Sequence, residues 1–372
     1  MKKIVLALCI IAVVSMSAFA QENNPIVTSV PSLSIATDAR GSAMGDVGAA
    51  TSPDVNSQFW NPSKYVFMES EAGASLSYTP WLRQLVTDID LAYLAGYWKF
   101  DQRQALSTSL RYFSLGEIMM TGEDGGELYT AHPNEFAIDA AYSRMLSDNL
   151  SAAATLRFIY SDLGNGSGSV EMYPGAAVAA DVSAYYKTKI AVENVDGNLG
   201  IGLNISNIGS KVSYDKQASS NFLPTNLRLG GSFDYPIDNY NRFSVSADIN
   251  KLLVPTQNDM TIDEYYDLSP LAGVFKSFGD APGGASEEIS EIMWSIGAEY
   301  AYNNQFFVRG GYYNESQYKG NRKYFTAGAG FKLNVFQLDA SYVISTSQSN
   351  PLDKTLRFSL SFDLFGLKNL VK

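Results

Sequence analysis

Few residues in this sequence are of the types that usually carry out chemistry. Among 372 residues there is one histidine, His132, and one cysteine, Cys9. His132 stands next to Pro133 with no neighbouring serine, so a Ser-His-Asp site would depend on this histidine alone. Cys9 lies in an N-terminal stretch that we expect to be removed, which leaves no cysteine for a disulfide, a zinc thiolate or a nucleophile. We therefore predict no catalytic residue, no cofactor, no metal and no enzyme activity.

Carboxylates gather in one stretch after Leu252, at Asp259, Asp263, Glu264 and Asp267. Their oxygens could bind calcium, but the stretch lacks the regular ligand spacing and central glycine of a calcium-binding loop. A solvated acidic loop is the simpler interpretation. The formal net charge of the whole chain is −11, and removal of the two N-terminal lysines changes it to −13. An acidic protein with a pI of about 4.7 is a poor partner for nucleic acid.

Residues 1–20 have the anatomy of a secretory signal peptide. Lys2 and Lys3 precede an apolar run from Ile4 to Val14, and Ala18-Phe19-Ala20 forms a cleavage site before Gln21. The apolar run is too short to cross a bilayer as a helix. A lipoprotein signal ending at Cys9 is the alternative, but the apolar run continues past the cysteine. We predict an exported chain that begins at Gln21.

A strict alternation of apolar and polar residues organises the rest of the chain. In Leu356–Phe365, LRFSLSFDLF, the five residues Leu356, Phe358, Leu360, Phe362 and Leu364 share one face of a strand. The same pattern recurs about fourteen times from Glu71 onwards, and bacterial outer-membrane barrels have even strand numbers. We predict an all-β fold: a transmembrane antiparallel β-barrel of about 14 strands over residues 71–372, in the cell outer membrane.

The lengths of the connections support a barrel over a soluble β-sandwich. Short turns, such as Ser147–Asn149 and Asn303–Asn304, alternate with long loops, such as Gly116–Pro133 and Leu252–Glu288. Barrels of the outer membrane have short periplasmic turns and long external loops, whereas a sandwich need not obey this rule. One connection, Lys187–Asn198, is long on the side predicted to be short.

The inner face of the predicted barrel is polar and mixed in charge. Its charged residues are Asp90, Arg111, Asp139, Arg157, Asp181, Arg228, Asp234, Asp248, Glu299, Arg309, Asp339, Arg357 and Asp363. They could line a path for ions or solutes, but buried charges must be compensated, so we expect them to pair with each other and with a plug. Tyrosines and tryptophans near strand ends fit an aromatic girdle, with sugar or partner stacking as the alternative.

Residues 21–70, which precede the first strand, are rich in small residues and helix breakers. The stretch Asp38-Ala39-Arg40-Gly41-Ser42-Ala43-Met44-Gly45 is followed by Phe59-Trp60-Asn61-Pro62. No apolar strand precedes the glycines, so they do not form a nucleotide-binding loop. Short helical turns are expected, and such a segment ahead of a barrel is best interpreted as an N-terminal plug (hatch) that enters the lumen from the periplasm. We select Asp38, Arg40, Gly41, Gly45, Asn61 and Pro62 as its motif.

This plug motif, followed by a barrel of this size, resembles the FadL-like outer-membrane proteins and, among them, the PorV (LptO) family of the type IX secretion system. Ser63 replaces the alanine of the Asn-Pro-Ala motif. The resemblance implies a non-enzymatic carrier in contact with outer-membrane lipid. It would receive secreted proteins with a C-terminal sorting domain from the type IX translocon barrel. It would then deliver them to a surface attachment complex that contains a sortase.

The loop Gly116–Pro133 carries the candidate contact residues for such cargo. Ile118, Met119, Met120 and Leu128 are apolar side chains in a predicted external loop, and flexible methionines suit a surface that accepts many partners. Their alternative role is to pack the loops over the barrel mouth. The alternative function is that of a FadL-like transporter of hydrophobic small molecules, which needs an apolar cavity. An open porin would leave the plug without a purpose.

Overall fold

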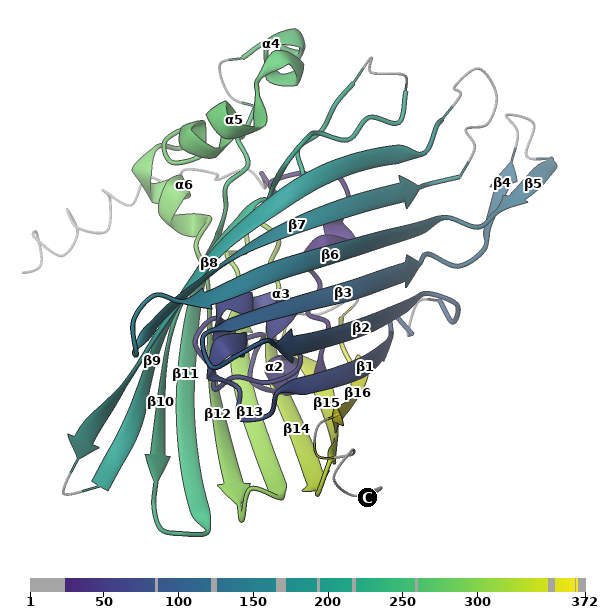
Figure 1. The fold of residues 1–372 in the computed structure, drawn as a ribbon. Helices are drawn as coiled ribbons and strands as arrows, with labels where there is room; N and C mark the ends of the chain where they lie inside the picture. The colour runs from purple at the N-terminus through teal and green to yellow at the C-terminus, as the bar shows by residue number, and fades with distance from the viewer. Residues whose placement is uncertain are drawn as a thin grey trace, which may run out of the picture.

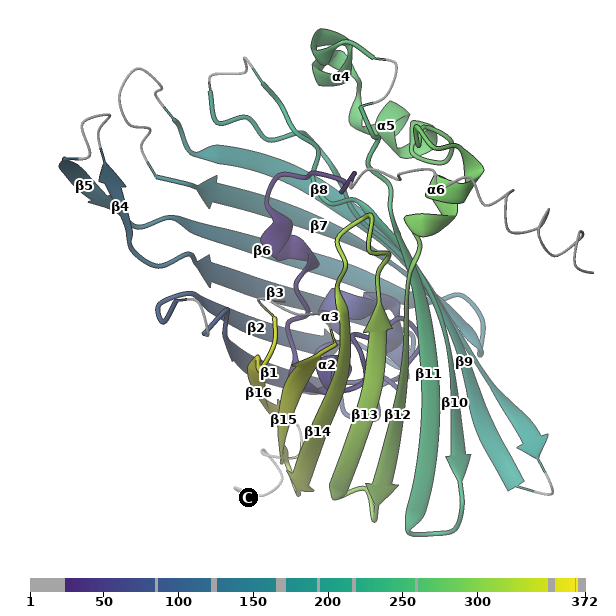
Figure 2. The same ribbon diagram turned by 180° about the vertical axis from the view of Figure 1, so that it is seen from behind.

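The computed structural model describes residues 24–83, 86–121, 126–164, 172–192, 195–215, 219–257, 260–346, 352–364 and 366. The predicted signal peptide and the predicted start of the mature chain at Gln21 lie outside this part of the chain. Within it, the molecule is a closed antiparallel β-barrel with a filled lumen and a helical segment above one end (Figures 1 and 2).

Fourteen strands form the barrel, in agreement with the number predicted from the alternation. They are β1 (Ala72–Pro80), β2 (Asp90–Lys99), β3 (Gln104–Ser114), β6 (Asn134–Met145), β7 (Leu150–Asp162), β8 (Gly175–Val192), β9 (Val195–Gly209), β10 (Asn226–Pro236), β11 (Asn241–Leu252), β12 (Met293–Tyr302), β13 (Phe306–Asn314), β14 (Lys323–Leu333), β15 (Phe336–Ser345) and β16 (Leu356–Asp363). The sheet closes where β16 pairs with β1, with Leu360 opposite Leu76. Closure removes the free edges that an open sheet would present to lipid.

The alternation in the sequence becomes the difference between the two faces of the wall. Large apolar side chains such as Leu94, Leu156 and Val308 are exposed on the outside, and Leu156 is 74% exposed. Small and polar side chains such as Ser75 and Thr155 are buried on the inside. A wall that is apolar outside and polar inside is the arrangement that a hydrocarbon environment requires.

Among the described residues, short turns and long loops alternate around the whole barrel, as predicted. Between β8 and β9, the segment expected to be a long turn is strand instead, because the ladder continues from Lys187 opposite Gly200 to Val192 opposite Val195. This hairpin extends past β7, whose pairing with β8 ends with Leu150 opposite Tyr186. The expected long connection is therefore wrong. β8 and β9 are longer than the other strands, and their paired ends occupy the segment that the sequence pattern assigns to a loop.

The segment before the barrel lies inside it. It comprises η1 (Pro31–Ser34), α2 (Ala39–Ala43), α3 (Ser57–Trp60) and η2 (Pro62–Phe67), and no strand, as the small residues and breakers predicted. The predicted entry from the short-turn end is wrong: Asn24 donates its backbone N–H to the carbonyl oxygen of Tyr318, in the long loop between β13 and β14. The described chain therefore starts at the long-loop end, descends through the lumen and joins β1 at the short-turn end (Figure 2). Sequence pattern alone carries no information about the end from which a chain enters.

Two of the long loops contain secondary structure of their own. The loop after β3 forms a separate two-stranded sheet of β4 (Ile118–Thr121) and β5 (Glu127–Ala131), which projects beyond the barrel (Figure 1). The loop after β11 forms three short helices, α4 (Ile262–Asp267), α5 (Pro270–Lys276) and α6 (Ala285–Ser290). In the described part of the chain no helix has both the length and the apolar character needed to cross a membrane.

Candidate functional site in the plugged barrel

Arg40 of the plug motif is the centre of a buried ion network that joins the plug to the wall. Its guanidinium contacts the Asp54 carboxylate at 2.7 Å and the Glu299 carboxylate of β12 at 3.1 Å. Glu299 also binds Arg309 at 2.7 Å, and Arg309 reaches Asp339 on β15 at 2.6 Å. Alternating charges in a water-poor site compensate one another, and losing one would leave its partners buried and unpaired.

Asp38 and Trp60 fix the fold of the plug itself. Asp38 caps α2, because its carboxylate accepts the backbone N–H of Gly41 at 2.8 Å, and it also accepts the indole N–H of Trp60 at 2.5 Å. The indole ring lies between Gly41 and Gly48, where an added Cβ at either glycine would overlap the ring. Burial, followed by the nearby Asp54 charge, raises the pKa of Asp38 to about 6.

Asn61 and Pro62 attach the second half of the plug to the opposite wall. The Asn61 side-chain amide donates to the carbonyl oxygens of Ala49 and of Ala184 on β8, both at 2.9 Å. The Pro62 carbonyl oxygen accepts the hydroxyl of Ser143 on β6 at 2.8 Å. Gly45, which adopts φ +77°, donates its N–H to Thr326 on β14 at 2.9 Å. All six predicted motif residues therefore lie in the plug, and together they link it to strands on both sides of the barrel.

The charged residues predicted for the inner face are mostly paired with one another or with the plug. Arg157 contacts Asp139 at 3.0 Å and Asp181 at 2.8 Å. Asp248 accepts the backbone N–H groups of Gly48 and Ala49, at 2.8 and 3.0 Å. The interpretation as compensation rather than an ion path is favoured by these contacts. The prediction that Asp90 faces inward is wrong: it lies on the outer face of β2 with Leu94 and Trp98, and it pairs with Arg83. Both faces of this strand carry large apolar side chains, so the alternation does not distinguish them.

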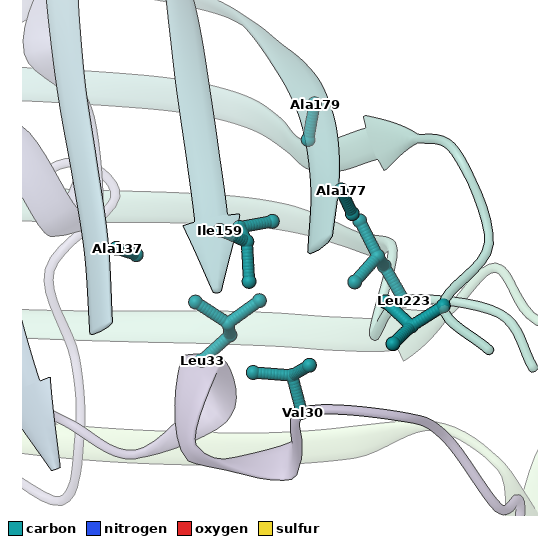
Figure 3. Close-up of a cluster of buried hydrophobic side chains, with 8 residues drawn as sticks. Val30, Leu33, Ala137, Ile159, Ala177, Ala179 and Leu223 are labelled. Atoms are coloured by element: carbon teal, nitrogen blue, oxygen red, sulfur yellow. The ribbon is translucent and has the colours of Figure 1, made fainter. Parts of the chain in front are cut away.

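Between the rim and the plug, residues 24–37 form a strap that passes through the lumen. Val30 and Leu33 of the strap pack with Ala137, Ile159 and Leu223 (Figure 3). Arg111 donates to the carbonyl oxygens of Ser32 and Ile35, the latter at 2.9 Å. Val30 has φ +50°, an unfavourable conformation for a β-branched residue, so the packing around it must hold the strap in place.

The strap divides the remaining space in the lumen. A cavity of about 570 Å³ opens on one side of it, lined by apolar side chains including Ile35, Trp81, Phe113 and Val343 and by Arg322 and Arg357. Two smaller spaces, of about 70 and 20 Å³, are both bordered by Leu33 of the strap. The Arg357 Nε is buried and has no hydrogen-bond partner among the described residues. The cavity combines an apolar wall with basic groups, so its size and lining suit a small amphiphile.

The predicted contact residues lie on the projecting β4–β5 hairpin. Ile118 is 41% exposed and Met119 is 56% exposed, while Met120 is half-buried. Leu128 lies in β5, but its side chain is outside the described part of the structure. The exposure of Met119 favours the contact role for this residue, whereas Ile118 and Met120 are covered over about half of their surface or more, which also fits the packing role.

The remaining chemical candidates are not assembled into a site. His132 is exposed, and its ring is 3.9 Å from the Glu117 carboxylate, which is also exposed. In the acidic loop, Asp259 lies outside the described residues, and Glu264 accepts the backbone N–H of Thr261 as part of a helix-capping box at α4. The described residues contain no group of three or more histidines, cysteines and acids that could hold a metal ion.

Sequence reasoning gave no role to Trp60, which it placed only in the stretch before Asn61, and it missed Lys64 entirely. The Lys64 ammonium is fully buried and donates to the Gly48 carbonyl oxygen at 2.8 Å and to the Thr51 hydroxyl at 3.0 Å. Burial lowers its pKa to about 8. The only available signal was the position of both residues beside Asn61-Pro62, since nothing in the sequence marks a buried lysine.

The chain is similar to one known protein family and to several solved structures. The family model for the type IX secretion system protein PorV matches residues 18–259, about two thirds of the sequence. No curated protein matches the chain. Among solved structures, the Pseudomonas putida toluene transporter TodX is similar at 10% identity and a TM-score of 0.52, covering 87% of this chain and 96% of that one. The CymD monoaromatic hydrocarbon channel gives 12% identity, a TM-score of 0.52, and 90% and 98% coverage. At these identities the likeness concerns the fold alone.

Proposed function

Because the chain belongs to the PorV family of type IX secretion system proteins, we propose that it is a non-enzymatic carrier in the outer membrane. In this proposal it receives secreted proteins with a C-terminal sorting domain from the translocon barrel. It then hands them to the surface complex that attaches them through a sortase. The long loops face the cell surface and the short turns face the periplasm.

The plugged lumen is the observation that carries the proposal. Arg40, Asn61 and Gly45 link the plug to strands around the barrel, so the lumen is not an open route for a folded protein. Cargo must then bind outside the barrel wall, on the loops. The β4–β5 hairpin offers Ile118 and Met119 there, exposed and supported by a rigid base.

Co-purification tests the carrier role. The tagged protein is extracted from outer membranes in mild detergent, and bound proteins are identified by mass spectrometry. We expect secreted proteins that share a C-terminal domain, in amounts that fall when Ile118 and Met119 are both changed to serine. A matched control changes Thr121 and Thr130 of the same hairpin to serine. Absence of such proteins from both preparations would contradict the carrier role.

A second function, transport of hydrophobic small molecules, is favoured by the cavity of about 570 Å³. TodX and CymD are described as a toluene transporter and a monoaromatic hydrocarbon channel. The two functions are distinguished by uptake of labelled toluene into vesicles that contain the protein. A transporter loses uptake when Phe113 in the cavity wall is changed to arginine, whereas a carrier keeps its cargo in the co-purification assay.

A further inference from the structure

The helical loop after β11 is attached to the barrel in an unusual way. No side chain of α4 is buried, and Gly273 is the only buried residue of α5. In α6 the only buried residue is Glu287. Large apolar side chains of this loop, including Phe275 at 78% exposure, point away from the barrel. The buried Phe222 packs against Tyr265 of α4 and Gly273 of α5, so apolar contact beneath the loop is concentrated at these two helices, whereas the buried residue of α6 is charged.

Charged groups make the attachment at α6. Glu287 and Glu291 contact the Lys319 ammonium at 2.5 and 3.0 Å. Glu291 also binds Lys251, at the end of β11, and Glu288 contacts the same lysine at 3.1 Å. Lys319 and Glu291 are almost fully buried. We refer to these two lysines and three glutamates as the clasp.

The clasp also holds the upper end of the strap. The Asn24 side-chain amide donates to Glu287 at 3.2 Å, and its backbone N–H donates to Tyr318, the residue before Lys319. Residues 320–322, directly after Lys319, line the large cavity together with the strap. The clasp thus joins α6 to the β13–β14 loop by ion pairs, and both are joined to the strap by hydrogen bonds from Asn24.

We propose that the clasp is a release point for the strap. While the ion pairs are intact, α6 and the β13–β14 loop hold the upper end of the strap at Asn24, and the packing around Val30 and Leu33 holds the part below it. When Lys319 loses its glutamates, the upper strap is freed, and the spaces that the strap separates become one. The inference does not depend on the cargo, because it concerns the mouth of the barrel and not the β4–β5 hairpin.

A single reporter cysteine tests this. Ser29 of the strap is buried, and the described chain contains no cysteine, so Ser29→Cys places one protected thiol under the clasp. The purified protein in detergent is treated with a maleimide, and the labelling rate is measured. In this background we expect Lys319→Met to raise the rate at least about tenfold, because a buried carboxylate pair loses its cation. Lys319→Arg should stay near the parent rate.

Lys276→Met is the matched control, since it removes a lysine charge from an exposed site at the end of α5, on the helical loop that the clasp attaches. It should label at the parent rate. Equal rates for Lys319→Met and Lys276→Met would overturn the proposal, as would a parent thiol that reacts as fast as in unfolded protein. If Lys319→Met does not fold, as judged by heat-modifiable gel mobility, Glu287→Ala replaces it in the test: it removes the acceptor for Asn24 and one partner of Lys319, and leaves Lys319 paired with Glu291.

Discussion

The plug and the α4–α6 loop above the mouth are both held by buried ion pairs, but they differ in how many other contacts support those pairs. The plug adds to its ion pairs an indole ring enclosed by two glycines and hydrogen bonds to strands on opposite walls. The α4–α6 loop has fewer such contacts, chiefly Phe222 against Tyr265 and Gly273, and several of its large apolar side chains are exposed. The comparison favours a plug fixed by ion pairs together with close packing, and a loop whose attachment at α6 depends mainly on ion pairs.

The largest effect should follow from breaking the plug network. Glu299→Gln leaves Arg40 and Arg309 without their shared carboxylate, and loss of one partner of a buried pair typically costs about 3–5 kcal/mol. The free energy of unfolding in urea with lipid vesicles should fall by this amount. The same substitution at Glu264, an exposed acid of α4, should leave it nearly unchanged. Equal losses at the two sites would remove the distinction between plug and loop.

A smaller loss is expected from crowding the contact between plug and wall. A Cβ at Gly202 on β9 would overlap the carbonyl oxygen of Ala49, so Gly202→Val must displace the plug and should cost about 1–3 kcal/mol. Gly231 on β10 has no atoms near its Cβ position, and Gly231→Val should fold like the parent. The check is thermal unfolding of both variants, followed by the loss of heat-modifiable mobility.

The plug should also respond to pH through Asp38. Its pKa is raised to about 6 by burial, so the ionised carboxylate is disfavoured in the folded state. The resulting stabilisation is complete below the ordinary aspartate pKa and is lost as pH rises through about 6. Unfolding free energies between pH 5 and pH 8 should therefore decline more for the parent than for Asp38→Asn, which cannot ionise. Parallel pH profiles would contradict this origin.

The smallest effect on stability is expected at the long-loop end. Phe275→Ser removes an exposed ring from α5, and such changes usually alter stability by less than about 0.5 kcal/mol. The unfolding free energy should match the parent, which would sharpen the contrast with Glu299→Gln. A large loss would mean that this ring supports the loop within the protein itself, which would remove the contrast with the plug.

The sequence by itself determined the wall of the barrel. Alternation with a period of two fixes which side chains face lipid, and the turn lengths fix the order of hairpins, because both are local properties of a strand and its neighbour. The strands around Leu156 and Phe358 therefore present the faces that the pattern predicted. In β2 the two faces are reversed, with Leu91 and Tyr93 inside and Leu94 outside, because both faces of this strand are apolar. The pattern did not predict how far the β8–β9 hairpin extends, since strand length depends on a partner and not on the pattern.

Only the tertiary structure decided how the lumen and the mouth are organised. Arg40 and Glu299 are 259 positions apart, and Asn24 and Glu287 are 263 apart, so no local pattern links them. A charged residue on the inner face of a strand predicts that an opposite charge lies nearby. The sequence does not identify that partner, because it is set by the closure of the barrel around the plug. The direction in which the strap enters and the position of the clasp follow from that closure.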